Sequence, residues 1–256
     1  MSWERNIVIK SPQEIAALRE AGRINARALE AVRQLIHPGV TTAELDAAAE
    51  EVIRKHGAIP TFMGVPGKYP YPASICASIN EQLVHGIPGK RKLQEGDIIS
   101  IDCGSTFEGF VGDSAFTMGV GKISSLAQRL IEVSEQALEI GIRQLRAGNR
   151  VGDVSAAIQA HVEAAGFYVT REYTGHGVGR QMWEGPQVPN YGIPGRGMVL
   201  RQGMCIALEP MVLVSTSQTR VLPDQWTVVS TDGSLTAHWE HSVAITDGDP
   251  LILTLP

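Results

Sequence analysis

Residues 38–58, PGVTTAELDAAAEEVIRKHGA, return in altered form at residues 147–167, AGNRVGDVSAAIQAHVEAAGF. Aligned at an offset of 147 − 38 = 109, the two stretches share central alanines and end on matched glycines, Gly57 and Gly166. Apolar residues recur in both at helical spacing, and a glycine after the last of them is typical of a helix end. The pattern predicts one helix over about 42–56 and another over 152–165.

A second pair of matching blocks follows the first. LQEGDIISID, residues 93–102, lies over LRQGMCIALE, residues 200–209, at an offset of 200 − 93 = 107. Two blocks in the same order and at nearly one offset favour a duplicated unit over chance or a solenoid of many repeats. We therefore expect an α+β fold in a single domain, residues 1–256, with halves at about 10–120 and 124–250. Each half should supply helices and antiparallel strands, and a pseudo-twofold axis should relate the halves.

The other elements follow from capping and periodicity. Ser11-Pro12-Gln13-Glu14 has the form of a capping box with proline in the first turn, so a helix should begin there and end at His37-Pro38-Gly39. A further helix is expected over 124–146, and a Gly- and Pro-rich loop over 60–72. Apolar and β-branched residues between turn signals predict strands at residues 74–79, 97–102 and 109–118.

Composition narrows the function classes. The chain has 256 residues, of which 43% are hydrophobic and 19% charged, as in an ordinary globular protein. A net charge of −5 and a longest basic run of Lys90-Arg91-Lys92 argue against nucleic-acid binding. MSWERNIVIK lacks the apolar core of a signal peptide, and no stretch is long enough for a membrane span. The three cysteines, an odd and widely spaced set, indicate reduced thiols in the cytoplasm.

The duplication also pairs acidic residues. Asp102 and Glu209 fall at the ends of the matched strands, and each is followed by a second acid, Asp113 or Glu240, beyond a turn. If each half forms a hairpin, four carboxylates converge between the halves. Each acid alone is more typical of a cap or a solvated edge. Together they interrupt very apolar strands, where an unpaired buried charge would be costly.

Converging carboxylates require cations. In a low-dielectric cleft like charges raise each other's pKa, so four acids cannot all stay ionised without divalent metal. His176, between glycines in TGHGVG, is expected in a glycine-rich turn and can add one nitrogen ligand. A mostly oxygen site with one imidazole suits Mn, Fe, Co or Zn better than it suits a structural zinc.

The order of motifs carries a family resemblance. SICASINEQLVHGIP, DIISIDCGSTFEGFVGDSAFT, EYTGHGVGR, IALEPMV and WTVVSTDGSLTAHWEHS follow one another along nearly the whole chain. This series closely resembles the methionine aminopeptidases, which are metallopeptidases of the pita-bread fold. Because Glu209 and Glu240 are only 240 − 209 = 31 positions apart, the chain resembles the type I form. The resemblance implies a hydrolase that removes the N-terminal methionine of nascent, deformylated polypeptides when the second residue is small.

The resemblance also implies roles for individual residues. Two divalent ions (Co, Mn, Fe or Zn) would be held by Asp102, Asp113, His176, Glu209 and Glu240, with Asp113 and Glu240 bridging. Glu209 would also act as general base, and His85 would contact the substrate near the scissile amide. The methionine side chain would lie against Tyr71, Cys76 and Trp226. The implied partners are polypeptide N-termini, with docking on the ribosome left open, and a monomer is expected.

Two features depart from the family pattern. The loop before SIC reads GVPGKYPYP, has Val65 and is about three residues longer. More important, the family places a second histidine seven residues after the metal-binding one, where this chain has Trp183. An indole N–H donates one hydrogen bond but neither accepts one nor titrates. Trp183 is then either a pocket-wall residue that also touches substrate, or the sign of a slowed or re-specified enzyme.

Two alternatives stay open. One is a peptide-binding protein of this fold with weakened or lost catalysis, favoured by Trp183 and opposed by the five intact ligands. The other is an Xaa-Pro peptidase, whose usual extra N-terminal domain would not fit in 256 residues.

Overall fold

The computed structural model describes residues 7–256, so residues 1–6, on which part of the signal-peptide argument falls, lie outside the described residues. The helices are α1 (Pro12–Leu35), α2 (Thr42–Lys55), α3 (Ser125–Gln144) and α4 (Val151–Ala164). The strands are β1 (Ile59–Pro60), β2 (Ile75–Ile79), β3 (Gln82–Val84), β4 (Ile98–Phe107), β5 (Phe110–Gly119), β6 (Tyr168–Val169), β7 (Thr174–Gly177), β8 (Glu184–Pro189), β9 (Cys205–Leu208), β10 (Met211–Leu213), β11 (Thr219–Val221), β12 (Val228–Ser230), β13 (Thr236–His238), β14 (Glu240–Ala244) and β15 (Leu251–Ile252).

The predicted helices are confirmed, and their ends have local causes. At α1 the Ser11 hydroxyl accepts a hydrogen bond from the Glu14 N–H, and the Glu14 carboxylate accepts one from the Ser11 N–H. Thr41 and Glu44 form the same reciprocal box at α2. Each box satisfies backbone donors that the first helical turn leaves unpaired, so the start of the helix is encoded locally. None of the helices within residues 7–256 is long and apolar enough to cross a membrane.

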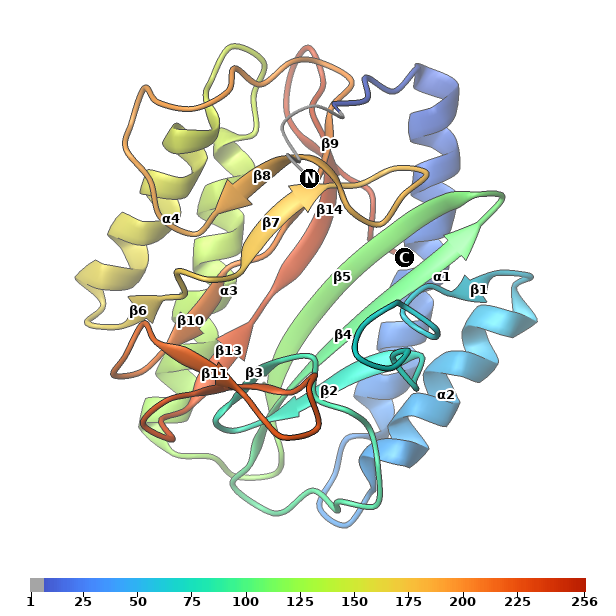
Figure 1. Cartoon of the computed structure of the whole chain (residues 1–256), viewed down its shortest axis with the longest axis vertical. Helices are drawn as coiled ribbons and strands as arrows, with labels where there is room; N and C mark the ends of the chain where they lie inside the picture. The colour runs from blue at the N-terminus through green and yellow to red at the C-terminus, as the bar shows by residue number, and fades with distance from the viewer. Residues whose placement is uncertain (1–6) are drawn as a thin grey trace.

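A nine-stranded sheet lies at the centre of the molecule. Along its main path the order is β1-β4-β5-β14-β9-β7-β8, with β2 beside β4 and β15 beside β14. The junction between the two halves of the sequence is therefore the pairing of β5 with β14, which is antiparallel. In Figure 1 the α1–α2 pair lies towards the right of this sheet and the α3–α4 pair lies towards its left.

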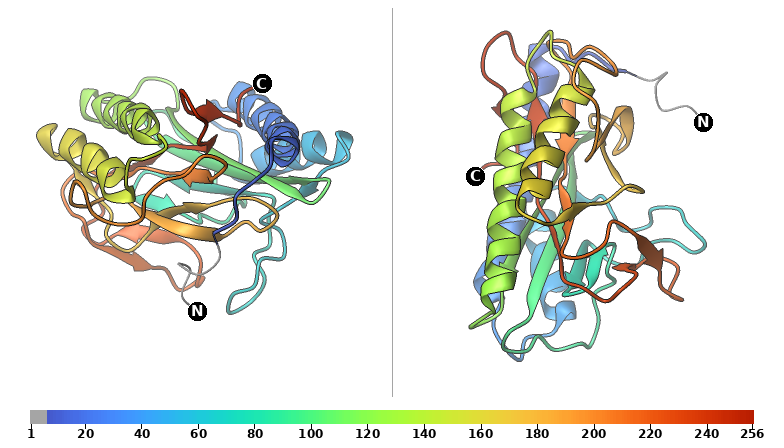
Figure 2. Two further views of the ribbon diagram at one scale, coloured as in Figure 1. Left: turned by 90° about the horizontal axis from the view of Figure 1, so that it is seen from above. Right: turned by 90° about the vertical axis from the view of Figure 1, so that its left-hand side faces the viewer.

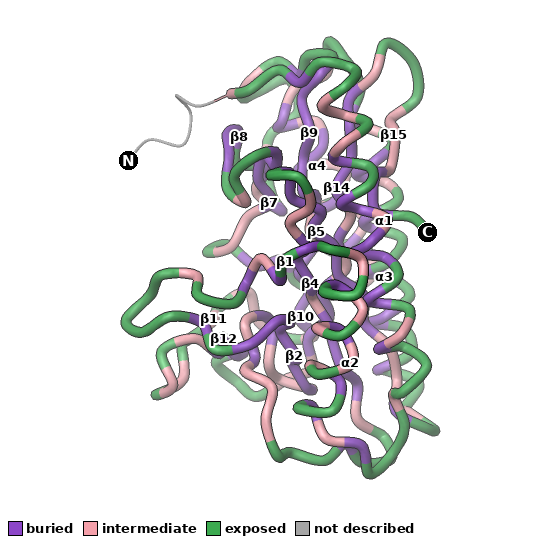
Figure 3. Tube along the Cα trace, turned by 90° about the vertical axis from the view of Figure 1, so that its right-hand side faces the viewer, coloured by how far each residue is buried: buried purple, intermediate pink, exposed green. Residues whose placement is uncertain are grey.

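All four helices cover the same face of the sheet. In Figure 2 they lie together on one side, with the hairpin of β11 and β12 on the opposite side. Beneath α1 and α2 the core includes Ile99, Ile101 and Cys103 of β4, and beneath α3 and α4 it includes Ile206 and Leu208 of β9. The burial colouring of Figure 3 follows this plan, with buried central strands and exposed outer helix surfaces.

Helix α1 docks closely on the β4–β5 hairpin. A Cβ added at Gly112 of β5 would lie 2.6 Å from the Gly22 nitrogen of α1, so the contact needs glycine. Asn25 of α1 is fully buried and donates hydrogen bonds to the carbonyls of Cys103 and Gly112. This contact fixes the hairpin against the helix layer and leaves its other face free.

The structure corrects three details of the sequence interpretation. Strand β4 continues to Phe107, so Asp102 lies within the strand instead of at its end. His176 lies in a short strand, β7, and not in a glycine-rich turn. In the second half the two acid-bearing strands, β9 and β14, pair with each other but are separated in sequence by β10–β13, so this half is not a simple hairpin. β4 is extended by its hairpin partner β5, whereas β7, β9 and β14 pair with strands that are more distant in sequence.

Candidate metal centre and pocket

Asp102 and Asp113 lie on the face of the sheet away from the helices. In the β4–β5 pair Asp102 is opposite Ala115, and Asp113 is two residues before Ala115. Because strand side chains alternate between faces, all three share one face, and the two acids are diagonal neighbours. Ile101 and Cys103, on either side of Asp102, pack under the helices, so Asp102 points the other way.

The neighbouring strands bring the other three groups to the same face. Glu240 is opposite Ala115 on the β14 side, so the small alanine lies between Asp102 and Glu240. The β14–β9 register places Glu209, the residue after β9, next to Glu240. His176 of β7 is opposite Ala207, two residues before Glu209. Five neighbouring strands, β4, β5, β14, β9 and β7, thus each contribute one group to a single cluster.

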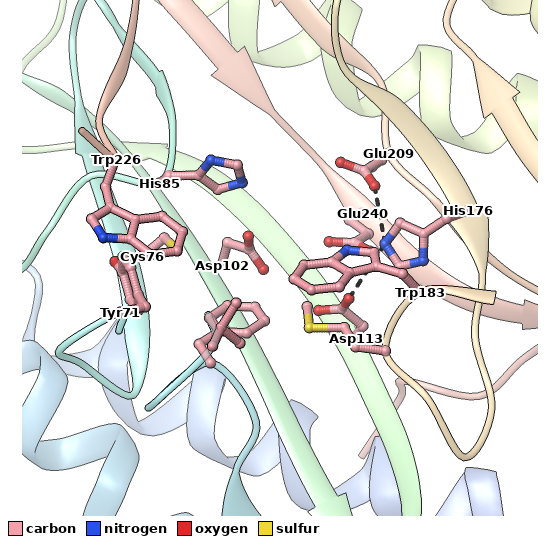
Figure 4. Close-up of a pocket in the computed structure, with 13 residues that line it drawn as sticks. Tyr71, Cys76, His85, Asp102, Asp113, His176, Trp183, Glu209, Trp226 and Glu240 are labelled. Carbon is pink, nitrogen blue, oxygen red and sulfur yellow. Dashed lines mark ion pairs between the residues drawn. The ribbon is translucent and has the colours of Figure 1, made fainter. Parts of the chain in front are cut away.

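The distances match that arrangement. One ligand atom each of Asp113, His176 and Glu240 lie within 4.8 Å of one another. His176 Nε2 is 3.4 Å from Glu209 Oε1 and 3.8 Å from Asp113 Oδ2. Asp102 lines the same cavity beside them, as Figure 4 shows. The five groups named from the sequence therefore converge, with Asp113, His176 and Glu240 as the tightest set.

His176 is held in the tautomer that a metal ligand needs. Its Nδ1 is 2.9 Å from the Gly177 carbonyl oxygen, which can only accept, so Nδ1 carries the proton. Burial lowers the pKa of His176 to about 4, so the ring is neutral and Nε2 presents a lone pair. A lone pair facing two carboxylates is unfavourable until a cation lies between them.

The acids also lack counter-charges. Asp102 Oδ1, Asp113 Oδ1 and Glu240 Oε1 are buried without a hydrogen-bond partner in the described part of the chain. Burial raises the pKa of Asp113 to about 7. Burial, followed by the charges of neighbouring carboxylates, raises the pKa values of Asp102, Glu209 and Glu240 well above their usual range. Such a group of oxygens with one imidazole nitrogen fits divalent cations of the Mn, Fe, Co or Zn type.

This cluster lines one part of a cavity of about 90 Å³, and apolar and aromatic side chains line the rest. The Tyr71 and Trp226 rings meet edge to face with centroids 5.1 Å apart, and Cys76 completes the wall. Burial raises the pKa of the Cys76 thiol well above its usual range, so the wall is uncharged there. The ten site residues named from the sequence all line this pocket: Tyr71, Cys76, His85, Asp102, Asp113, His176, Trp183, Glu209, Trp226 and Glu240.

His85 and Trp183 both line the cavity, with His85 nearer to Trp226 and Trp183 nearer to His176 (Figure 4). His85 adopts a left-handed backbone conformation, φ 59°, which is uncommon outside glycine and is found at functional sites. Burial lowers its pKa to about 4, so its imidazole is neutral. Trp183 also lines this cavity and is 41% exposed, so its indole lies at a solvent-facing part of the wall.

The structure adds lining residues that the sequence did not single out. Phe62 and Met182 line the apolar pocket, and Val65 of the longer loop joins them. His238 lies 3.6 Å, by its Nε2, from Glu209 Oε2 and lines a second cavity that borders the cluster. The sequence could have indicated that His238 lies at the site, because His238 is two residues before Glu240 and alternate residues of a strand share a face.

Comparison with known proteins agrees with this geometry. Residues 16–247 match the model of metallopeptidase family M24. The chain is 48% identical over 249 residues to a methionine aminopeptidase of Clostridium perfringens, covering 97% of this chain and 99% of that protein. It is 49% identical over 248 residues to methionine aminopeptidase 1 of Bacillus subtilis, with the same coverage. The crystal structure of a Thermotoga maritima methionine aminopeptidase superposes with a TM-score of 0.95 at 44% identity, covering 98% of this chain and 100% of that one.

Proposed function

The chain belongs to metallopeptidase family M24, and we propose that its pocket removes the N-terminal methionine from polypeptides whose second residue is small. As a metallo-aminopeptidase it hydrolyses the first peptide bond. One observation carries the proposal: a five-group, cation-requiring cluster lies directly beside a small apolar pocket. The pocket can receive an unbranched side chain, and sulfur–aromatic contacts with Tyr71 and Trp226 suit a thioether.

The metal assignment is part of this proposal. Asp113 and Glu240, on the adjacent strands β5 and β14, would bridge two divalent ions. Asp102 would complete one ion, and His176 with Glu209 the other. When bound, the ions supply Lewis acidity, which acidifies water and polarises the scissile carbonyl. Manganese, iron, cobalt and zinc all suit this donor set.

The protein's own side chains would orient and deprotonate the reactants. Each oxygen of the Glu209 carboxylate faces an imidazole, Oε1 that of His176 and Oε2 that of His238. We assign Glu209 the role of general base, taking the proton from the attacking water. The neutral His85 imidazole would donate a hydrogen bond to the substrate near the scissile amide.

Trp183 would set the limit on the second residue. Its indole lines a solvent-facing part of the cavity, where the side chain after methionine would lie, so a small side chain would fit there and a bulky one would not. The same residue favours the second candidate, a peptide-binding protein with weakened or lost catalysis. The proposed substrates are deformylated nascent polypeptides in the cytoplasm, and the proposed enzyme acts as a monomer.

A turnover assay tests the proposal. Purified protein is incubated with Met-Ala-Ser or Met-Leu-Ser and with Mn²⁺ or Co²⁺, and free methionine is measured. We expect release from Met-Ala-Ser only, abolished by a chelator and by Glu209→Gln. Equal rates on both peptides would reject the role of Trp183. Binding of Met-Ala-Ser without turnover under every metal would support the non-catalytic candidate.

A further inference from the structure

His238 is a buried imidazole without an assigned role. It ends β13, and its side chain is 2% exposed. Its backbone is fixed to β5 on both sides, because the Thr117 hydroxyl accepts from its N–H at 2.9 Å and donates to its carbonyl at 2.8 Å. The backbone that carries the ring is therefore fixed, by these two hydrogen bonds and by the pairing of β13 with β10.

The ring nitrogen Nε2 of His238 has no hydrogen-bond partner among residues 7–256. Buried polar atoms are nearly always paired, so an orphan in a native structure calls for an explanation. Nε2 faces two carboxylate oxygens, Glu209 Oε2 at 3.6 Å and Glu240 Oε2 at 3.9 Å. Both distances are slightly longer than a hydrogen bond, and a shift of under about 1 Å would close either one.

Glu209 is the better acceptor of the two. Its carboxylate lies between two imidazoles, with Oε1 3.4 Å from His176 Nε2 and Oε2 3.6 Å from His238 Nε2. The Nδ1 of His176 is committed to the Gly177 carbonyl, so its Nε2 has no proton to give. None of the described residues donates a hydrogen bond to the Glu209 carboxylate, and His238 is the one placed to do so.

We propose that His238 is a positioning residue, which donates its Nε2–H to Glu209 Oε2 and fixes the orientation of that carboxylate. The inference rests on the proposed function, in which Glu209 is both a metal ligand and the general base. Replacing a residue that hydrogen-bonds a metal-ligating side chain and orients it typically changes metal affinity or activity by about 10–100-fold. His238 also lines the second cavity, of about 350 Å³, with His85 and Trp183, so direct contact with substrate is the competing role.

A matched pair of variants separates these roles. His238→Gln keeps an N–H donor of similar reach. His238→Met introduces a side chain of nearly the same shape as glutamine but without an N–H donor. The control is His241→Gln on β14, because His241 bonds Thr254 Oγ1 through Nδ1 at 2.8 Å, away from the acids. For each protein, kcat and KM are measured on Met-Ala-Ser, and Mn²⁺ affinity is measured by titration calorimetry.

We expect His238→Met to lower both kcat and Mn²⁺ affinity by about 10–100-fold with little change in KM, and His238→Gln to recover most of each loss. His241→Gln should change neither. A rise in KM alone would make His238 a substrate contact and overturn the proposal. Equal losses in the Gln and Met variants would also overturn it, since donation would then be irrelevant.

A measurement on the unaltered protein keeps the test decisive if His238→Met fails to fold. The imidazole ¹⁵N spectrum of the Zn²⁺-loaded protein reports which ring nitrogen carries the proton, and the His238 signals are those lost in His238→Gln. The proposal requires the Nε2–H tautomer, and an Nδ1–H tautomer would refute it. If unaltered protein with metal does not cleave Met-Ala-Ser, the proposed function fails, while the tautomer and the Mn²⁺ titrations still decide the role of His238.

Discussion

Replacing Lys10 by methionine should strongly destabilise the protein, because it leaves the Glu184 charge buried and unpaired. Lys10 Nζ lies 2.6 Å from Glu184 Oε2, and the two side chains are only 2% and 5% exposed. The other Glu184 oxygen accepts from the Gln181 N–H at 3.2 Å. Glu184 therefore ties the segment that carries Met182 and Trp183 to the chain just before α1.

The size of the effect follows from the burial. Removing one partner of a buried ion pair typically costs about 3–5 kcal/mol, since the remaining charge loses its compensation. In a chain of this size each kcal/mol shifts Tm by about 2–4 °C, so Lys10→Met should lower Tm by about 6–20 °C. Arg143→Met is the control, because Arg143 pairs with Glu139 on the exposed surface of α3 and its loss should cost under about 0.5 kcal/mol.

The assay is a double-mutant cycle read by urea unfolding and by kcat on Met-Ala-Ser. Lys10→Met and Glu184→Gln should each be destabilising, and the double variant should regain much of the loss because no buried charge is left alone. In the folded single variants kcat should fall, since Trp183 directly precedes the released Glu184. A coupling energy near zero, or Lys10→Met as stable as Arg143→Met, would refute this reasoning.

Three further predictions concern the site and the packing. Asp113→Asn should leave fewer than two tightly bound ions by metal analysis and abolish turnover; two retained ions would contradict a bridging role. Gly112→Ala should lower the free energy of unfolding by about 1–3 kcal/mol, because the new Cβ would meet α1 at 2.6 Å, whereas Gly89→Ala enters open space and should be neutral in the same urea titration. Trp183→His should raise kcat with little change in KM, by up to about 10²–10³-fold if the imidazole donates to the scissile carbonyl; an unchanged or lower kcat would show that this site does not use a donor there.

The helices were predictable because their signals are local. The reciprocal cap of Ser11 and Glu14, and the glycines Gly57 and Gly166 that follow the last turns of α2 and α4, act within a few residues of the chain. The acids were predictable for a different reason. Several carboxylates within apolar strands are costly together when they are buried without cations, so their joint presence indicated a cation site before any contact was known.

The sequence by itself determined which groups take part: local patterning and side-chain chemistry indicated four helices, an antiparallel α+β fold and five candidate ligands, and the family resemblance added the aromatic pocket wall. Only the tertiary structure decided how they meet. Asp102 and Glu240 share a face because Ala115 is paired to both, and the strand that carries Glu240, β14, is distant in sequence from the β4–β5 hairpin. Lys10 reaches Glu184 across 174 residues, and His238 reaches Glu209 from a different strand. Such contacts leave no periodic pattern in the sequence. Their energy depends on burial, and the burial exists only after the sheet and helices have packed together.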